Sequence, residues 1–312
     1  MLYGDFLAFP FPQDQLFAHR EHLEFDPELC LDLFHATSAP PNARKMTDII
    51  RHHTWFLEQV GRQTGYAKEG CFFGLQHPPD NVTADDIMVL AGIGVRFMTI
   101  AYLGENEYGG AFDRPHTPLS PRGELLLEAM STGRMVLDLS HAGHRTAREA
   151  LGYIAKRQLP LRVVATHTAC FSRFDHPRAL PDDILRGIAE LGGLVGLVTV
   201  TWMLHESDNS MRPFHEHLEH LMALVGTSHV CLGTDGVYRR LNPEEERKRF
   251  ELMKDKLDPS GIFRARYPEQ PEKLNTPQRL LVIEEELGLR GYSSSSIKKI
   301  LGENLAQFLS RI

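Results

Sequence analysis

The chain has 312 residues, 42% of them hydrophobic, and this length and composition allow one large buried core. Its formal net charge is -7 and its basic residues are scattered among acidic ones, so we expect neither nucleic acid nor a membrane as a partner. The four cysteines lie far apart without C-x-x-C spacing, which argues against a disulfide framework and a zinc ribbon. The first residues lack the pattern of a secretory leader, so we expect a cytoplasmic location.

The predicted elements begin with a short candidate strand at residues 4–9, followed by two segments with helical patterns at 17–35 and 46–65. From residue 71 onward, short apolar runs alternate with longer segments of helical periodicity. These runs cover residues 71–76, 95–102, 135–141, 163–167, 194–200 and 230–235. Their nearly continuous hydrophobicity is typical of strands that are buried on both faces of a parallel sheet.

Several of the segments between the runs have recognisable helix starts. Residues 83–91, 120–130 and 181–191 begin with Thr, Ser-Pro or Pro-Asp-Asp, which are favoured at helix N-termini. The charged segment 239–276 predicts a helix and a surface loop, and residues 291–312 predict a final amphipathic helix. Because strands and helices alternate and no G-x-G-x-x-G follows a run, we predict one α/β domain over residues 1–312, a (β/α)8 TIM-barrel-like fold rather than a doubly wound sheet.

Five of the six runs end in a side chain with chemical capacity. These residues are Gln76, Tyr102, His141, His167 and Asp235. Because the carboxyl ends of barrel strands face one mouth, residues that are distant in sequence are expected to converge there. The sequence therefore predicts a small-molecule site at this end of the barrel.

His141 and His167 end successive runs, a position from which two imidazoles can bind one metal ion such as zinc. The alternative is that each is a histidine hydrogen-bonded to a neighbour. Asp138 lies on the same run among apolar neighbours, which favours a buried structural hydrogen bond over a ligand role. Asp235 suits either general acid/base chemistry or a turn, since Gly236 follows it.

Ordered motifs through residues 70–312 resemble the renal (membrane) dipeptidase family of zinc metallopeptidases. Residues 133–151 (GRMVLDLSHAGHRTAREAL) are similar to the family's G-M-x-x-D-L-S-H segment, and residues 163–183 to its V-I-x-S-H-S and R-N-x-P-D-D segment. Residues 217–236 (HLEHLMALVGTSHVCLGTDG) are similar to its H-I-x-H and V-G-I-G-S-D segment. The segment that starts GIGVRFMTIAY and the closing GYSSSSIKKILGENLAQFL also have counterparts in the family.

The resemblance implies a metal-dependent hydrolase that holds two zinc ions in a distorted barrel and cleaves dipeptides. His141 and His167 match the two histidines of the second metal site, and Asp235 matches the catalytic aspartate. Arg178 matches the arginine that grips the substrate carboxylate, a task that suits a bidentate guanidinium. Tyr102 stands where the family has a histidine that contacts substrate.

The sequence also departs from the family pattern, mainly at the metal centre. The family's first strand carries H-x-D, whereas residues 4–7 contain no histidine and offer only Asp5. Gln76 stands where the family has a bridging glutamate, and a neutral amide cannot offset the charge of two cations. Residues 1–69 therefore diverge from the family, and we expect zero or one zinc ion in place of two.

Three functions remain as alternatives. The first is a hydrolase of dipeptides or related small amides that uses one metal at His141 and His167, with Asp5 as a further candidate ligand. The second is a catalytically inactive paralogue that keeps Arg178 and Asp235 in a small-molecule binding or structural role. The third is a lyase or isomerase that uses Tyr102 and Asp235 as acid and base. A dipeptide-like small molecule is the expected partner, and a homodimer is compatible with each alternative.

Overall fold

A barrel of parallel strands forms the centre of the molecule. The computed structural model describes residues 1–9, 26–62, 70–258 and 260–312. Its main sheet has eight parallel strands. In order they are β1 (Gly4–Asp5), β3 (Leu33–Thr37), β4 (Cys71–Leu75), β5 (Val95–Thr99), β6 (Val136–Asp138), β7 (Arg162–Thr168), β8 (Val195–Leu197) and β9 (Val230–Leu232). Phe6 N donates to Leu232 O at 2.7 Å, which links β9 back to β1 and nearly closes the barrel.

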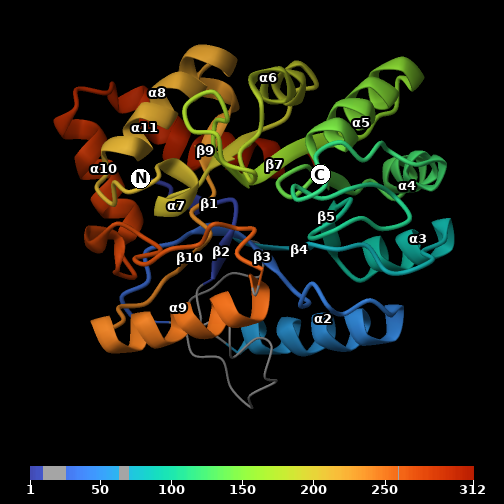
Figure 1. The fold of residues 1–312 in the computed structure, drawn as a ribbon, viewed down its shortest axis with the longest axis horizontal. Helices are drawn as coiled ribbons and strands as arrows, with labels where there is room; N and C mark the ends of the chain where they lie inside the picture. The colour runs from blue at the N-terminus through green and yellow to red at the C-terminus, as the bar shows by residue number, and fades with distance from the viewer. Residues whose placement is uncertain (10–25, 63–69, 259) are drawn as a thin grey trace.

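Helices surround these strands (Figure 1). They are α2 (Met46–Gly61), α3 (Ala84–Gly92), α4 (Pro121–Thr132), α5 (His144–Arg157), α6 (Asp182–Glu190), α7 (Thr201–Leu204), α8 (Arg212–Val225), α9 (Pro243–Leu257), α10 (Arg279–Leu289), α11 (Ser294–Lys298) and α12 (Asn304–Leu309), with a π-helical turn at Lys299–Glu303. A small second sheet pairs β2 (Ala8–Phe9) with β10 (Gly236–Val237). Local sequence explains several helix starts: Thr83 and Asp86 form a capping box before α3, and the Ser120 hydroxyl accepts from Gly123 N before α4.

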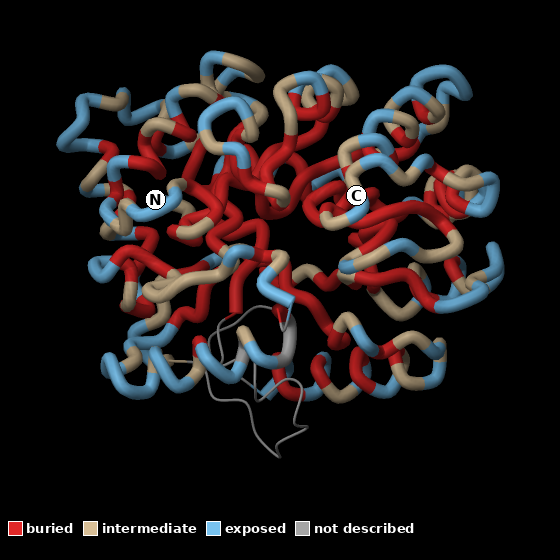
Figure 2. The backbone as a smooth tube through the Cα atoms, in the orientation of Figure 1, coloured by how far each residue is buried: buried red, intermediate tan, exposed pale blue. Residues whose placement is uncertain are grey.

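The hydrophobic core lies on both sides of the strands (Figure 2). The larger part fills the space between the barrel and its helices, and a smaller cluster lies inside the barrel. The inner cluster joins Phe6, Phe97 and Val136 from the strand region to Leu305 and Phe308 of α12. The C-terminal helix therefore helps to fill the barrel interior with side chains. Among the described residues, no helix has both the length and the apolar character needed to cross a bilayer.

The structure confirms most of the predicted elements. Each of the six apolar runs contains a barrel strand, and the helix starts near residues 83, 120 and 181 are correct. The prediction of a helix over residues 17–35 was wrong at its end, because Leu33–Thr37 forms β3; residues 17–25 lie outside the described part. The candidate strand at 4–9 is divided into β1 and β2, which belong to different sheets.

Two buried aspartates connect strand ends by the same arrangement. Asp5, at the end of β1, accepts hydrogen bonds from Leu7 N, Thr234 N, Thr234 Oγ1 and Tyr238 OH, at 2.5 to 3.0 Å. Asp138, at the end of β6, accepts from Ser140 N, Ser140 Oγ, Thr166 N and Thr166 Oγ1 at 2.6 to 3.0 Å. Each carboxyl thus joins its own strand to a threonine beside another strand. Such a fully hydrogen-bonded buried group fixes local geometry.

We predict that Asp5→Ala lowers the free energy of unfolding by about 3 kcal/mol, because it leaves several buried donors without an acceptor. Urea denaturation followed by circular dichroism measures this loss. Asp5→Asn is the matched control, since it keeps the shape and one acceptor oxygen and should lose less. An unchanged midpoint for Asp5→Ala would contradict a structural role for this carboxyl.

Candidate active site

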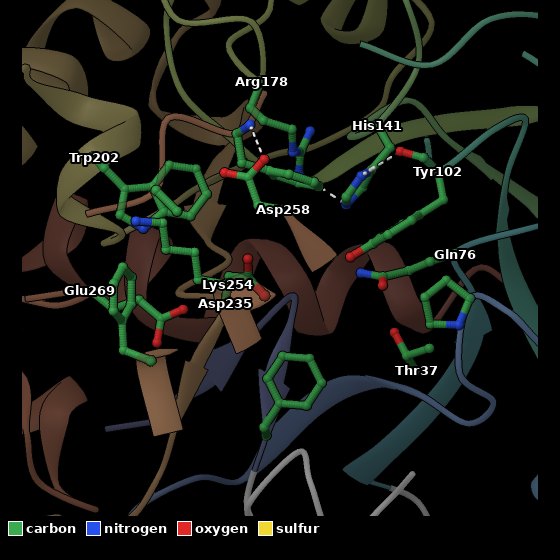
Figure 3. Close-up of a pocket in the computed structure, with 15 residues that line it drawn as sticks. Thr37, Gln76, Tyr102, His141, Arg178, Trp202, Asp235, Lys254, Asp258 and Glu269 are labelled. Carbon is green, nitrogen blue, oxygen red and sulfur yellow. Dashed lines mark hydrogen bonds between the residues drawn. The ribbon is translucent and has the colours of Figure 1, made fainter. Parts of the chain in front are cut away.

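The strand ends and helix α9 enclose a pocket at the mouth of the barrel (Figure 3). Of the predicted site residues, Gln76, Tyr102, His141, Arg178 and Asp235 line it together. The enclosed cavity measures about 90 Å³, which is room for a few water molecules.

His141 lines this pocket, and His167, which is not among the lining residues, faces His141 from behind it. Their Nε2 atoms are 3.0 Å apart, and both side chains are buried. His141 Nδ1 donates to Tyr102 O at 3.2 Å, so in the neutral ring its Nε2 carries a lone pair. His167 Nδ1 lies 2.8 Å from Thr166 Oγ1, whose hydroxyl also contacts Asp138. Burial and the nearby Arg178 guanidinium lower the pKa of both histidines well below the usual value.

The Arg178 guanidinium contacts the histidine pair directly. Its Nη2 donates to His141 Nε2 at 3.0 Å, and its Nη1 donates to Ser140 O. The side chain is buried and lies over the Phe112 ring, with 5.4 Å from Cζ to the ring centroid. Burial lowers the pKa of Arg178 to about 10, so it stays charged at neutral pH. The site thus has a fixed positive charge beside two neutral imidazoles.

Tyr102 is stacked on His141, with ring centroids 4.3 Å apart and an interplanar angle of 25°. Burial raises the pKa of its phenol, and the Asp235 carboxyl acts in the same direction. The phenol therefore remains protonated at neutral pH. This state is compatible with the alternative in which Tyr102 serves as an acid, and it leaves the phenol able to donate a hydrogen bond.

Asp235 follows β9 in a turn, where its φ of 51° is left-handed and unusual for a residue with a side chain. Asp235 N donates to Leu7 O at 3.0 Å, which helps to hold this turn against the N-terminal strand region. Burial raises the pKa of the Asp235 carboxyl to about 7, and the charge of Glu269 adds to this effect while Arg178 opposes it. A carboxyl with such a pKa can exchange a proton near neutral pH.

Asp5 does not contribute to the pocket as the sequence suggested. Both of its carboxyl oxygens are used in hydrogen bonds to Leu7, Thr234 and Tyr238, so its suggested role as a metal ligand is corrected to a structural one. In the short segment that directly follows β1, the apolar Phe9 of β2 lines the pocket. Gln76 does line the pocket, but it brings a neutral amide.

The donor set therefore does not fit a two-zinc centre. Two imidazole Nε2 atoms 3.0 Å apart approach the roughly 3.3 Å that one tetrahedral zinc with bonds near 2.0 Å imposes. A catalytic zinc commonly has three protein ligands, however, and in the described residues no three His, Cys, Asp or Glu side chains group in a way that could hold a metal ion. Arg178 moreover brings a positive charge to one of the two nitrogens.

The remaining pocket wall comes largely from the segment that was predicted as a surface loop. We call residues 243–269, which comprise α9 and the chain that follows it, the cap. Its pocket-lining side chains are Phe250, Lys254, Asp258, Phe263, Ala265 and Glu269. No periodic pattern in the sequence indicates this placement. Trp202 also lines the pocket. It comes two residues after the apolar run at 194–200, so its place near a strand end was a sequence signal that could have marked it as a site residue.

Comparisons with known proteins agree with this architecture. The model of a family described as membrane dipeptidase (Peptidase family M19) matches residues 81–257. A curated relative, dipeptidase verJ from Clonostachys rogersoniana, is 26% identical over 175 residues, which cover 54% of this chain and 44% of the relative. The chain spans less than half of the length of the curated relatives it matches.

Solved structures with 16% to 19% identity share the fold. An amidohydrolase from Pseudomonas aeruginosa has a TM-score of 0.71 and 19% identity, and the alignment covers 99% of this chain and 95% of that one. A metallopeptidase from Rhodobacter sphaeroides, liganded with a phosphinate mimic of the dipeptide L-Ala-D-Ala, has a TM-score of 0.68 and 16% identity, with coverage of 100% and 99%.

We predict that the purified protein carries at most one divalent metal ion per chain, measured by elemental analysis. Arg178→Ala should increase the uptake of Co²⁺, seen as visible absorption, because it removes a positive charge from the His141 and His167 pair. The double variant Arg178→Ala/His167→Ala is the matched control and should lose that gain. Two zinc ions per wild-type chain would contradict our assignment of the donor set.

Proposed function

Because this chain belongs to the membrane dipeptidase family, Peptidase family M19, we propose that it recognises a dipeptide or a related small amide at the mouth of its barrel. The M19 family is metal-dependent, and membership supports a dipeptidase-like hydrolase. In this chain we propose that ligand binding is retained while two-metal hydrolysis is not. The protein would then act as a small-molecule binding member of the family.

The buried Arg178 guanidinium is the observation that carries this proposal. It is a permanent positive charge in a pocket with aromatic walls, and its planar fork is suited to a carboxylate. Its contacts with His141 and Ser140 hold the group in place and leave further N–H donors. A ligand carboxylate at Arg178 would also lie near Asp235, whose raised pKa reduces repulsion below neutral pH.

Within this proposal, the chain's own residues have distinct tasks. Arg178 binds the carboxylate, Tyr102 offers a phenolic hydrogen bond, and the rings of Trp202 and Phe263 exclude water from the ligand. Asp235 accepts or returns a proton at its carboxyl oxygen. These tasks describe binding and orientation and do not by themselves cleave an amide.

A second function, hydrolysis with one metal, is favoured by one specific observation. The Nε2 atoms of His141 and His167 converge to 3.0 Å, and Asp138 orients the His167 ring through Thr166, as acceptors behind metal-ligating histidines commonly do. The missing third ligand and the adjacent guanidinium weigh against it. The dipeptide-binding and hydrolysis measurements below distinguish this one-metal alternative from a binding function.

We predict that calorimetric titration detects binding of one or more L,L or L,D dipeptides, and that Arg178→Met weakens it by about tenfold to a hundredfold. Arg178→Lys, the matched control, keeps the charge without the fork and should fall in between. Equal affinity in Arg178→Met and wild type would overturn the proposal. Zinc-dependent hydrolysis of the same peptides that disappears in His167→Ala would instead establish the one-metal function.

We also predict that affinity for a dipeptide carboxylate falls as the pH rises through about 7. Below this pH the Asp235 carboxyl is protonated and the charge of Arg178 is free to attract the ligand, whereas above it the Asp235 carboxylate neutralises part of that charge. Titrations between pH 5.5 and 8.5 (roughly one and a half pH units on either side of the Asp235 pKa) measure the step. The control, Asp235→Asn, should remove it; a step of equal size in this variant would assign it to another group.

A further inference from the structure

The family match ends within the cap, which forms one side of the pocket. The family model ends at residue 257, whereas Asp258, Phe263, Ala265 and Glu269 follow it and line the pocket. The barrel side of the pocket contributes Arg178 and Tyr102. The side chains of the cap are therefore candidates for residues that determine which ligand this chain binds.

Asp258 is the cap residue whose bonding is incomplete. Its side chain is 3% exposed and lines the pocket. Oδ1 accepts from Phe263 N at 3.0 Å, while Oδ2 has no hydrogen-bond partner among the described residues. Leaving a buried carboxyl oxygen without a partner costs free energy, so a group with this bonding usually has a further purpose.

The position of Asp258 adds to that cost. It is the C-cap residue of α9, where the helix dipole presents its negative end and disfavours a carboxylate. Its backbone N–H donates to Lys254 O at 2.8 Å, so the main chain ends the helix without help from the side chain. Helix stability therefore does not explain an acidic residue at this place.

A second incomplete group lies in the same pocket wall. Trp202 Nε1 is buried and has no hydrogen-bond partner among the described residues. The Trp202 ring meets Phe263 edge to face, with centroids 6.3 Å apart. The wall thus combines an unused acceptor, an unused donor and aromatic faces, which together suit an ammonium group next to a carbonyl oxygen.

We propose that Asp258 binds the free amino group of the ligand and that Trp202 Nε1 donates to the neighbouring carbonyl oxygen. The inference rests on the proposed function and narrows it to compounds with a free α-amino group beside a carbonyl, such as dipeptides with an unblocked N-terminus. Arg178 at the barrel side then takes the carboxylate. Arg178 and Asp258 thus offer opposite charges within one pocket, which match the two ends of a zwitterion.

The Lys254 ammonium could compete with a ligand's amino group for the Asp258 carboxyl. It lies one helical turn before Asp258 on α9 and also lines the pocket, but no hydrogen bond or ion pair joins the two side chains in this structure. If its ammonium serves as the permanent partner of Asp258, an external amine gains nothing there. Lys254→Met separates the two cases: under our proposal the wild type already prefers the free amine and the variant keeps or strengthens this preference, whereas an Asp258 paired with Lys254 would show it only in the variant.

The experiment compares L-alaninamide and L-Ala-L-Ala with their N-acetyl derivatives. A Trp55→Phe background leaves Trp202 as the only tryptophan, so its fluorescence reports binding at the pocket. We expect acetylation to weaken binding of both probes by about tenfold or more, and Asp258→Asn to abolish this difference. Asn keeps an acceptor oxygen for Phe263 N, so the variant should melt no lower than the parent.

Each outcome decides between the two proposals. Binding of L-alaninamide that depends on Asp258 supports this inference, even if dipeptides gain nothing from Arg178 and the proposed function fails. Dipeptide binding that is insensitive to acetylation, or an amine preference that persists in Asp258→Asn, overturns the inference and leaves the proposed function standing. A preference for the free amine that appears only in Lys254→Met, and not in the wild type, also overturns it. Failure of every probe to bind overturns both.

Discussion

The buried carboxyl of Asp138 is the interaction on which the arrangement of the site depends. It accepts from Ser140 and Thr166, and these two residues in turn hold the reactive groups. Ser140 Oγ accepts from His167 N, and Ser140 O accepts from Arg178 Nη1. One acidic group at the end of a strand therefore positions an imidazole and a guanidinium that come from different parts of the chain.

The same chemistry closes the barrel at the opposite seam. Asp5 and Thr234 repeat the pairing of Asp138 and Thr166, now between β1 and the residues after β9. Where the family resemblance led us to expect a metal ligand, the chain uses a carboxyl for hydrogen bonds between strands. The first strand thus lacks the family's metal ligands, and its only acidic residue forms hydrogen bonds between strands. Phe9 lines the adjoining part of the pocket.

The sequence was sufficient for the barrel and for the residues at the strand ends, because buried parallel strands read as apolar runs and their carboxyl ends share one mouth. It failed at β3, where LFHAT is short and contains a polar residue that tertiary packing buries. It also failed at the cap, because Phe263 and Trp202 meet only through folding and no local pattern marks them. The contact of Arg178 with His141 is of the same kind, since motif spacing gives order along the chain and not distance in space.

The left-handed backbone at Asp235 has a consequence for how this family member can change. Position 235 ends β9, starts the turn to β10 and bonds through its N–H to Leu7, so its main chain is set by the barrel seam. Only a few residue types, mainly Gly, Asn and Asp, adopt this conformation without a large penalty. Backbone geometry therefore favours these residue types when the amino acid at position 235 changes. Even without selection for proton chemistry, the backbone would favour residue types that accept a positive φ at this position, aspartate among them.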